Sequence, residues 1–219
     1  MTWTSPITPG LEYRDDDHAY LLHGERIPSV TAILQAAGMV EGAKFFTEAG
    51  RQRGSLIHAA LHDLQEDRLC FLAAELHGYI LSADLFWQAN RAALICSEIP
   101  MAHQVLRYGG TPDLPVVLLG EEKEPVVIDY KSGSYQAAHG VQVAAYVQLV
   151  RSNAEFLGLR GNEIPKRGLV LALQKDGSMA RLHDPAAEKK PLSQAQAWAF
   201  YQSALNIYRY KENFHRGNC

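Results

Sequence analysis

Two aspartates and a lysine stand at positions that suit cleavage of a phosphodiester bond. Asp113 begins one strand-like run, and Asp129 and Lys131 end the next. Because alternate residues of a strand share a face, Asp129 and Lys131 project together while Tyr130 points the other way. If the two runs pair as an antiparallel hairpin, both carboxylates and the ammonium meet at one end of a sheet.

These groups are the ones that metal-assisted hydrolysis needs. Carboxylate oxygens bind Mg²⁺ or Mn²⁺, which stabilises charge on phosphoryl oxygens and activates water. The Lys131 ammonium can orient or deprotonate that water, or neutralise the developing charge. Simpler interpretations are turn chemistry for Asp113 after Pro112, and a solvated charge pair for Asp129 and Lys131. The apolar run before Asp129 nevertheless indicates a buried strand, where an aspartate requires partners.

The surrounding elements predict an α/β (α+β) fold with a central mixed β-sheet flanked by helices. We expect one domain over residues 1–219, with an N-terminal hairpin and helices in 1–93 and the catalytic sheet core and C-terminal helix in 94–219. Helices are predicted from the Ser29 N-cap to Gly38, and over 42–67, 71–93, 136–151 and 195–215. Extended segments are predicted over 11–22, 94–105, 112–119, 125–130, 167–173 and 179–183.

Composition fits this picture without defining a function. The 219 residues are 47% hydrophobic and 21% charged, which suits a globular protein with a core. No long apolar run predicts a membrane span and no signal peptide is evident, so a cytoplasmic location is expected. The three cysteines form no CxxC pair. A net charge of −3 argues weakly against a tight, nonspecific nucleic-acid binder, but metal-binding carboxylates contribute to that value.

The ordered motifs resemble the PD-(D/E)XK nuclease superfamily. Pro112-Asp113 followed by Asp129-Tyr130-Lys131 matches its signature. Within it, the RGSLIH segment ending at His58 and the QVAAY segment from Gln142 to Tyr146 resemble the RecB-like exonuclease branch. The opening HAYLLHGERIPSVTAIL is similar to the start of many phage-encoded nucleases of this type.

The resemblance implies a restriction-endonuclease-like core and a metal-dependent DNA nuclease, in particular an exonuclease of recombination, repair or phage DNA processing. The cofactor would be Mg²⁺ or Mn²⁺, and no iron–sulfur cluster is expected because the four cysteines of the cluster-bearing members are missing. The partners would be DNA and, in a bacterial host cell, a single-strand annealing protein. The implied metal ligands are His58, Asp113, Asp129 and the carbonyl of Tyr130; the catalytic groups are Asp113, Asp129, Lys131 and Glu98; the DNA contacts are Gln142, Tyr146, Arg51 and Arg53.

Several alternatives stay open at this stage. His58 and His62 have the i, i+4 spacing of a zinc pair, or are ordinary helix histidines. Glu98 is either a supporting acid or an ordinary strand charge. At the level of the whole chain, a noncatalytic nucleic-acid-binding or assembly subunit could retain the same fold, and a metal-dependent hydrolase could act on something other than DNA. Oligomeric state cannot be read from the sequence.

Overall fold

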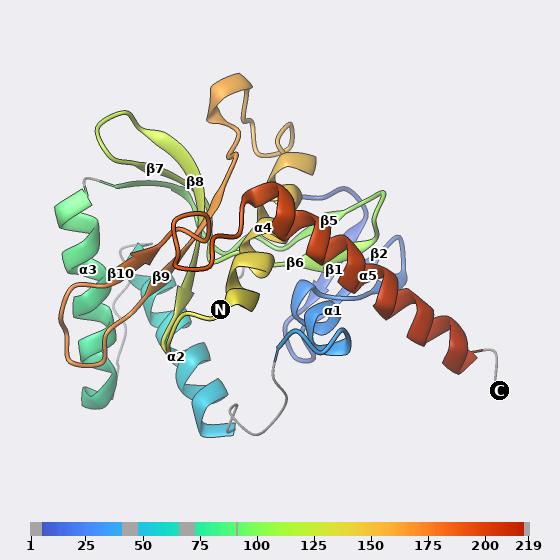
Figure 1. Cartoon of the computed structure of the whole chain (residues 1–219), viewed down its shortest axis with the longest axis horizontal. Helices are drawn as coiled ribbons and strands as arrows, with labels where there is room; N and C mark the ends of the chain where they lie inside the picture. Colours follow the sequence, from blue (N-terminus) through green and yellow to red (C-terminus); the bar gives the residue numbers. More distant parts are fainter. Residues whose placement is uncertain (1–5, 41–47, 66–72, 91, 217–219) are drawn as a thin grey trace.

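A five-stranded mixed sheet forms the centre of the protein (Figure 1). The computed structural model describes residues 6–40, 48–65, 73–90 and 92–216. The strand order is β10-β9-β8-β7-β4. The strands are β4 (Ala93–Cys96), β7 (Leu114–Leu119), β8 (Glu124–Lys131), β9 (Gly168–Ala172) and β10 (Arg181–His183). The predicted mixed sheet with flanking helices is therefore confirmed.

The predicted hairpin between the two aspartate-bearing runs is β7 and β8. Val117 pairs with Val126 and Leu119 with Glu124, in antiparallel register. Gly120 and Lys123 both adopt left-handed backbone conformations, with φ of 72° and 55°, which closes the turn between the strands. The hairpin brings the start of β7 to the end of β8, so Asp113 and the Asp129–Lys131 pair lie at the same end of the sheet.

Helices cover both faces of this sheet. One face carries α2 (Glu48–Gln65) and α3 (His77–Asn90), which a short 3₁₀ turn, η1 (Ala74–Leu76), precedes. The other face carries α1 (Val30–Ala36), α4 (Ala137–Ser152) and α5 (Gln194–Arg216). The helix α4 connects β8 to β9, which pair in parallel, and a second 3₁₀ turn, η2 (Gly161–Glu163), lies in the same connection.

The apolar pattern of β8 explains this two-layer burial. Val127 packs with α1, α4 and α5, whereas Ile128 and Tyr130 pack with α2 and α3. Because Cβ atoms alternate along a strand, Asp129 lies on the α4 side and Tyr130 on the other. Tyr130 is buried, and its hydroxyl accepts a hydrogen bond from Trp87 Nε1 at 3.2 Å.

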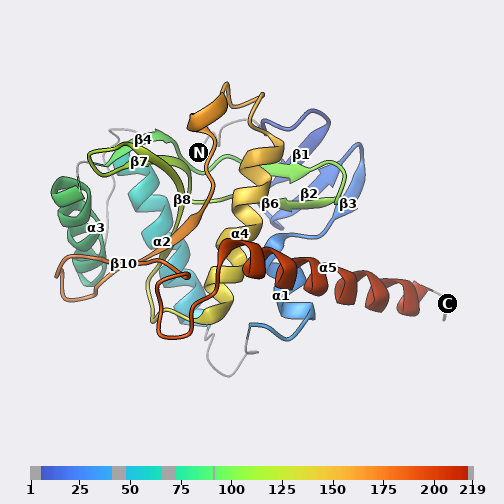
Figure 2. The same cartoon turned by 45° about the horizontal axis from the view of Figure 1, so that its top comes forward.

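Two small sheets lie beyond α4, which separates them from the central sheet in both views (Figures 1 and 2). One contains β1 (Leu11–Arg14), β2 (Ala19–Leu22) and β3 (Glu25–Ile27), and the other contains β5 (Met101–His103) and β6 (Tyr108–Gly110). The hairpin over 11–22 was predicted, but β3 and β6 were not. Tyr20 of β2 is hydrogen-bonded to Thr111 at 2.8 Å, which ties this region to the segment leading into Asp113.

The helix boundaries agree with the capping signals where the structure describes them. Ser29 caps α1 by accepting from the Ala32 N–H at 3.1 Å, and Gly38 ends the helix region with φ of 71°. The helix α2 runs without interruption through Gly54. Within the described residues, none of the helices is long and apolar enough to cross a membrane.

Candidate active site

Asp113 is held at the start of β7 by two different elements. Its Oδ1 lies 3.0 Å from His58 Nδ1 on α2, and its Oδ2 accepts a 2.7 Å hydrogen bond from the Tyr130 N–H on β8. The residue is 8% exposed. Asp113 therefore joins the helix on one face of the sheet to the backbone of the neighbouring strand.

Glu98 is brought to Asp113 by an unusual backbone turn. It follows β4 and has φ of 41°, a left-handed conformation that few non-glycine residues adopt. Its N–H donates to the Asp113 carbonyl at 3.0 Å. Ligand atoms of His58, Glu98 and Asp113 all lie within 4.8 Å of one another. Burial, followed by the charge of Asp113, raises the pKa of Glu98 to about 8.

Asp129 and Lys131 form the second half of the site. They share a face of β8, as predicted, and the Lys131 ammonium forms an ion pair with Asp129 Oδ2. Burial raises the pKa of Asp129 to about 6, although Lys131 opposes the shift. Burial lowers the pKa of Lys131, but Asp129 and Asp113 outweigh it and the net pKa is raised. Lys131 is therefore a protonated ammonium in the metal-free protein.

His58 and Asp113 also adjust each other's charge. Burial raises the pKa of Asp113, but the His58 imidazole and Lys131 oppose this and leave the net pKa lowered. Burial lowers the pKa of His58, and the adjacent Asp113 reverses the effect so that the net pKa is raised. In the absence of a cation, the imidazole and the carboxylate stabilise each other's charged forms.

Gln142 and Tyr146 lie one turn apart on α4, where Gln142 Nε2 donates to the Tyr146 hydroxyl at 3.1 Å. Tyr146 is 6% exposed, and burial together with the charge of Asp129 raises its pKa well above the usual value. The pair thus faces the Asp129 side of the sheet. Gln142 and Tyr146, which were predicted as DNA contacts, therefore lie beside the carboxylates.

The remaining sequence candidates lie outside this cluster. His62 lies one turn after His58 on α2, its Nδ1 is 3.0 Å from the Ser97 hydroxyl, and it does not belong to the three-residue ligand group. Arg53 is exposed on α2, one and a half turns before His58. The side chain of Arg51 lies outside the described residues.

Sequence reasoning missed two features of the site. Glu98 was expected as a supporting acid, but in the structure its side chain offers a ligand atom alongside His58 and Asp113. His139 on α4 carried no signal at all, yet burial, Lys131 and His183 together lower its pKa to about 3. Only its place on the first turn of the helix after the DYK run could have indicated its proximity to Lys131.

The site fits a divalent cation on its own donor chemistry. Two carboxylates and an imidazole offer oxygen and nitrogen atoms in one small volume, a mixture that suits Mn²⁺ and Mg²⁺. Asp129 Oδ2 is buried and forms an ion pair with the Lys131 ammonium, which balances its charge. A buried carboxylate oxygen requires such a positively charged partner.

The mixed sheet with strand order β10-β9-β8-β7-β4 carries acidic groups, an imidazole and a lysine close together at one end. This arrangement is typical of the restriction-endonuclease-like fold. The sequence model of the PD-(D/E)XK nuclease superfamily matches residues 33–218. The chain therefore belongs to the PD-(D/E)XK nuclease superfamily. A search of curated proteins found no match.

Proposed function

We propose that this protein is a metal-dependent DNA nuclease that hydrolyses phosphodiester bonds, and that it acts from DNA ends as a RecB-like exonuclease. The observation that supports this most directly is the His58–Glu98–Asp113 ligand group next to the buried Asp129–Lys131 pair. Metal-assisted hydrolysis of a phosphodiester is favoured by a cation site and by a positioned ammonium, and here candidates for both adjoin one end of the sheet.

The proposed ligands are His58, Glu98 and Asp113, with Asp129 and the Tyr130 carbonyl completing the set from β8. When bound, Mg²⁺ or Mn²⁺ would stabilise negative charge on the phosphoryl oxygens and lower the pKa of water. The Tyr130 N–H fixes one oxygen of Asp113 and leaves the other directed at His58. His58 therefore orients Asp113 in the structure, and it would be a ligand beside Asp113 if a cation were bound.

Lys131 is proposed as the catalytic lysine. Its raised pKa keeps the ammonium protonated, so it donates hydrogen bonds and does not remove a proton from water in the resting site. We assign it to neutralise charge on the phosphate and to orient the attacking water. Asp129 holds the ammonium in place through their ion pair.

Gln142, Tyr146, Arg51 and Arg53 are proposed as DNA contacts. The hydrogen bond from Gln142 orients the Tyr146 hydroxyl beside Asp129, where a bound strand would pass. Arg53 is exposed on α2 and carries a charge suited to the phosphate backbone. The biological setting that we propose is recombination, repair or phage DNA processing, in concert with a single-strand annealing protein.

The experiment that tests this function compares end-labelled linear DNA with a closed circle, in Mg²⁺, in Mn²⁺ and in EDTA. The proteins are the wild type, Lys131→Ala and, as a matched control, Lys166→Ala, which removes an exposed lysine elsewhere. We expect metal-dependent loss of the linear DNA alone, abolished in Lys131→Ala and retained in Lys166→Ala. Cutting of the circle would replace the exonuclease assignment with an endonuclease. A wild type that binds DNA but is inert with every metal would instead be a noncatalytic subunit.

A further inference from the structure

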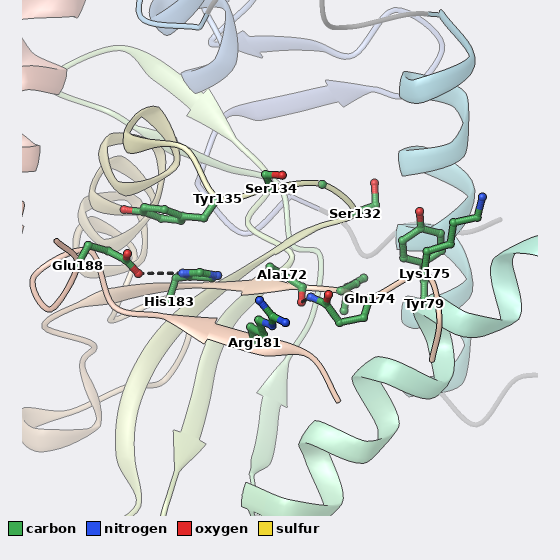
Figure 3. A pocket seen from close by; sticks show the side chains of 12 residues that line it. Tyr79, Ser132, Ser134, Tyr135, Ala172, Gln174, Lys175, Arg181, His183 and Glu188 are labelled. Atoms are coloured by element: carbon green, nitrogen blue, oxygen red, sulfur yellow. Dashed lines mark hydrogen bonds and ion pairs between the residues drawn. The ribbon is translucent and has the colours of Figure 1, made fainter. Parts of the chain in front are cut away.

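A cavity of about 520 Å³ lies beside the candidate active site, at the ends of β9 and β10 (Figure 3). The segment that directly follows Lys131, Ser132 to Tyr135, forms one side, and Arg181 and His183 of β10 form the opposite side. Lys175 stands at the far end, next to Tyr79 of α3. This volume falls within the range of sites that bind small ligands.

The turn that carries Lys175 is fixed against α3. Ser82 of α3 accepts a 2.9 Å hydrogen bond from the Gln174 N–H through its hydroxyl, and a 3.1 Å bond from the Ala180 N–H through its carbonyl. Gly78 approaches so closely that a Cβ there would lie 1.9 Å from the Lys175 carbonyl oxygen. This end of the cavity is therefore held in place before any ligand arrives.

The opposite end is fixed by an aromatic contact between two segments. The rings of Tyr135 and His183 stack with centroids 4.8 Å apart and an interplanar angle of 9°. His183 Nδ1 is also 2.8 Å from Glu188 Oε1, an interaction that orients the imidazole (Figure 3). The stack holds the segment after Lys131 against β10.

The cavity and the catalytic groups lie along the same end of the sheet. Lys131 pairs with Ala172 of β9, and the Leu173 N–H donates to the Lys131 carbonyl at 2.8 Å. Neighbouring strands are about 4.8 Å apart, so β10 lies about 10 Å from β8. That separation corresponds to roughly three nucleotides at the axial rise of a duplex strand, and to fewer in an extended single strand.

The charges of the cavity suit a phosphate backbone. Arg181 and Lys175 are both exposed and line the cavity. The exposed Asp176 carboxylate interacts electrostatically with Arg181. Ser132 and Ser134 supply hydroxyl groups from the facing segment. Glu188, the acid among the lining residues, is engaged with His183.

We propose that this cavity binds the nucleotides of the cleaved DNA strand next to the scissile phosphate, with Arg181 and Lys175 on its phosphates. This inference rests on the proposed nuclease function, and it assigns a path for the strand across the sheet end. The strand runs from the acids at β7 and β8, past Lys131, and into the space between the Ser132–Tyr135 segment and β10. Arginine and lysine at exposed positions are the groups that hold DNA phosphates in register.

The test is the affinity of the full chain for a short fluorescein-labelled single-stranded oligonucleotide, measured by anisotropy in Ca²⁺ at several salt concentrations. The variant is Lys175→Ala/Arg181→Ala. The control is Arg151→Ala/Arg160→Ala, which removes the same formal charge from a different cavity near the end of α4. We expect roughly tenfold weaker binding and a salt slope reduced by about 1 to 2 for the variant alone, as for the loss of one or two phosphate contacts.

The two proposals fail in distinguishable ways. If the wild type cleaves DNA while the variant binds with wild-type affinity and salt slope, the cavity is not on the strand path and the nuclease function stands. If the control loses as much affinity as the variant, the effect is general charge and the assignment is also wrong. If the wild type neither binds nor cleaves DNA, the nuclease function itself is refuted. Melting temperatures of all variants exclude loss of folding as the cause.

Discussion

The buried His139 makes the free energy of unfolding depend on pH. The ring lies on the first turn of α4, where Nδ1 accepts the Gln136 N–H at 3.2 Å. Burial lowers its pKa to about 3, and the positive charge of Lys131 and the neighbouring His183 add to the effect. The Tyr135 ring packs edge-on against the imidazole, with ring centroids 6.0 Å apart. Burial and the nearby positive charge of Lys131 are therefore what disfavour an imidazolium here.

The sign and size of this pH dependence follow from the difference in the pKa of His139 between the folded and the unfolded chain. The unfolded histidine takes up a proton as the pH falls below its ordinary pKa of 6.5, whereas the folded one, with its pKa lowered to about 3, stays neutral until the pH is much lower. The free energy of unfolding is therefore highest above pH 6.5 and decreases as the pH falls. At about pH 5 the mismatch is about 1.5 pKa units, which corresponds to about 2 kcal/mol at 1.36 kcal/mol per unit.

Urea unfolding of the wild type and His139→Gln over a range of about pH 5 to 7.5 measures this contribution. Glutamine at this helix position can accept the same N–H but does not titrate. We expect the variant to gain about 2 kcal/mol relative to the wild type between the two ends of the range. His77→Gln, at an exposed position on α3, serves as the control for replacing a histidine by glutamine. A difference between His139→Gln and the wild type that stays constant with pH would refute the buried, neutral histidine.

Four further substitutions test other parts of the structure. Glu98→Gln removes a buried acid whose pKa is raised to about 8. In EDTA near neutral pH, the melting temperature of the variant should therefore be higher than that of the wild type. The further increase on addition of Mn²⁺ should be smaller for the variant than for the wild type. Gly78→Ala should destabilise the protein by about 1 to 3 kcal/mol in urea unfolding, because the added Cβ would clash with the Lys175 backbone. Gly54→Ala, where the added Cβ meets open space, should stabilise α2 by up to about 1 kcal/mol in the same assay. Tyr146→Phe loses the hydrogen bond from Gln142 and should cost about 1 kcal/mol in the same assay.

The parts of the fold that could be predicted are those with a strong local pattern. The apolar run before Asp129 and the polar turn at 120–123 predicted the β7–β8 hairpin, because strand alternation and turn chemistry are properties of neighbouring residues. Ser29 and Gly38 bounded α1 correctly for the same reason. Once β7 and β8 pair, the meeting of Asp113 with Asp129 and Lys131 follows from geometry.

What escaped prediction depends on contacts between distant segments. The strand β6 contains Gly109 and Gly110, which have no β propensity, and it forms because it pairs with β5 and because the Gly109 N–H donates to the Pro28 carbonyl at 2.8 Å. Glu98 reaches Asp113 through a left-handed backbone that no local pattern announces. The cavity next to Lys131 is built from a segment on each side of α4 and from α3, so none of its lining residues forms a motif.

Burial of Glu98 and Asp129 would couple the binding of a cation in the proposed site to the release of protons. Glu98 and Asp129 have pKa values raised to about 8 and about 6, because the sheet end and its helices exclude water from them. At neutral pH the metal-free protein therefore keeps a proton on Glu98, which lowers the repulsion between it and Asp113. In the proposed site Glu98 would have to release that proton before its carboxylate could bind a cation, so the affinity for Mn²⁺ or Mg²⁺ is expected to increase as the pH rises toward about 8.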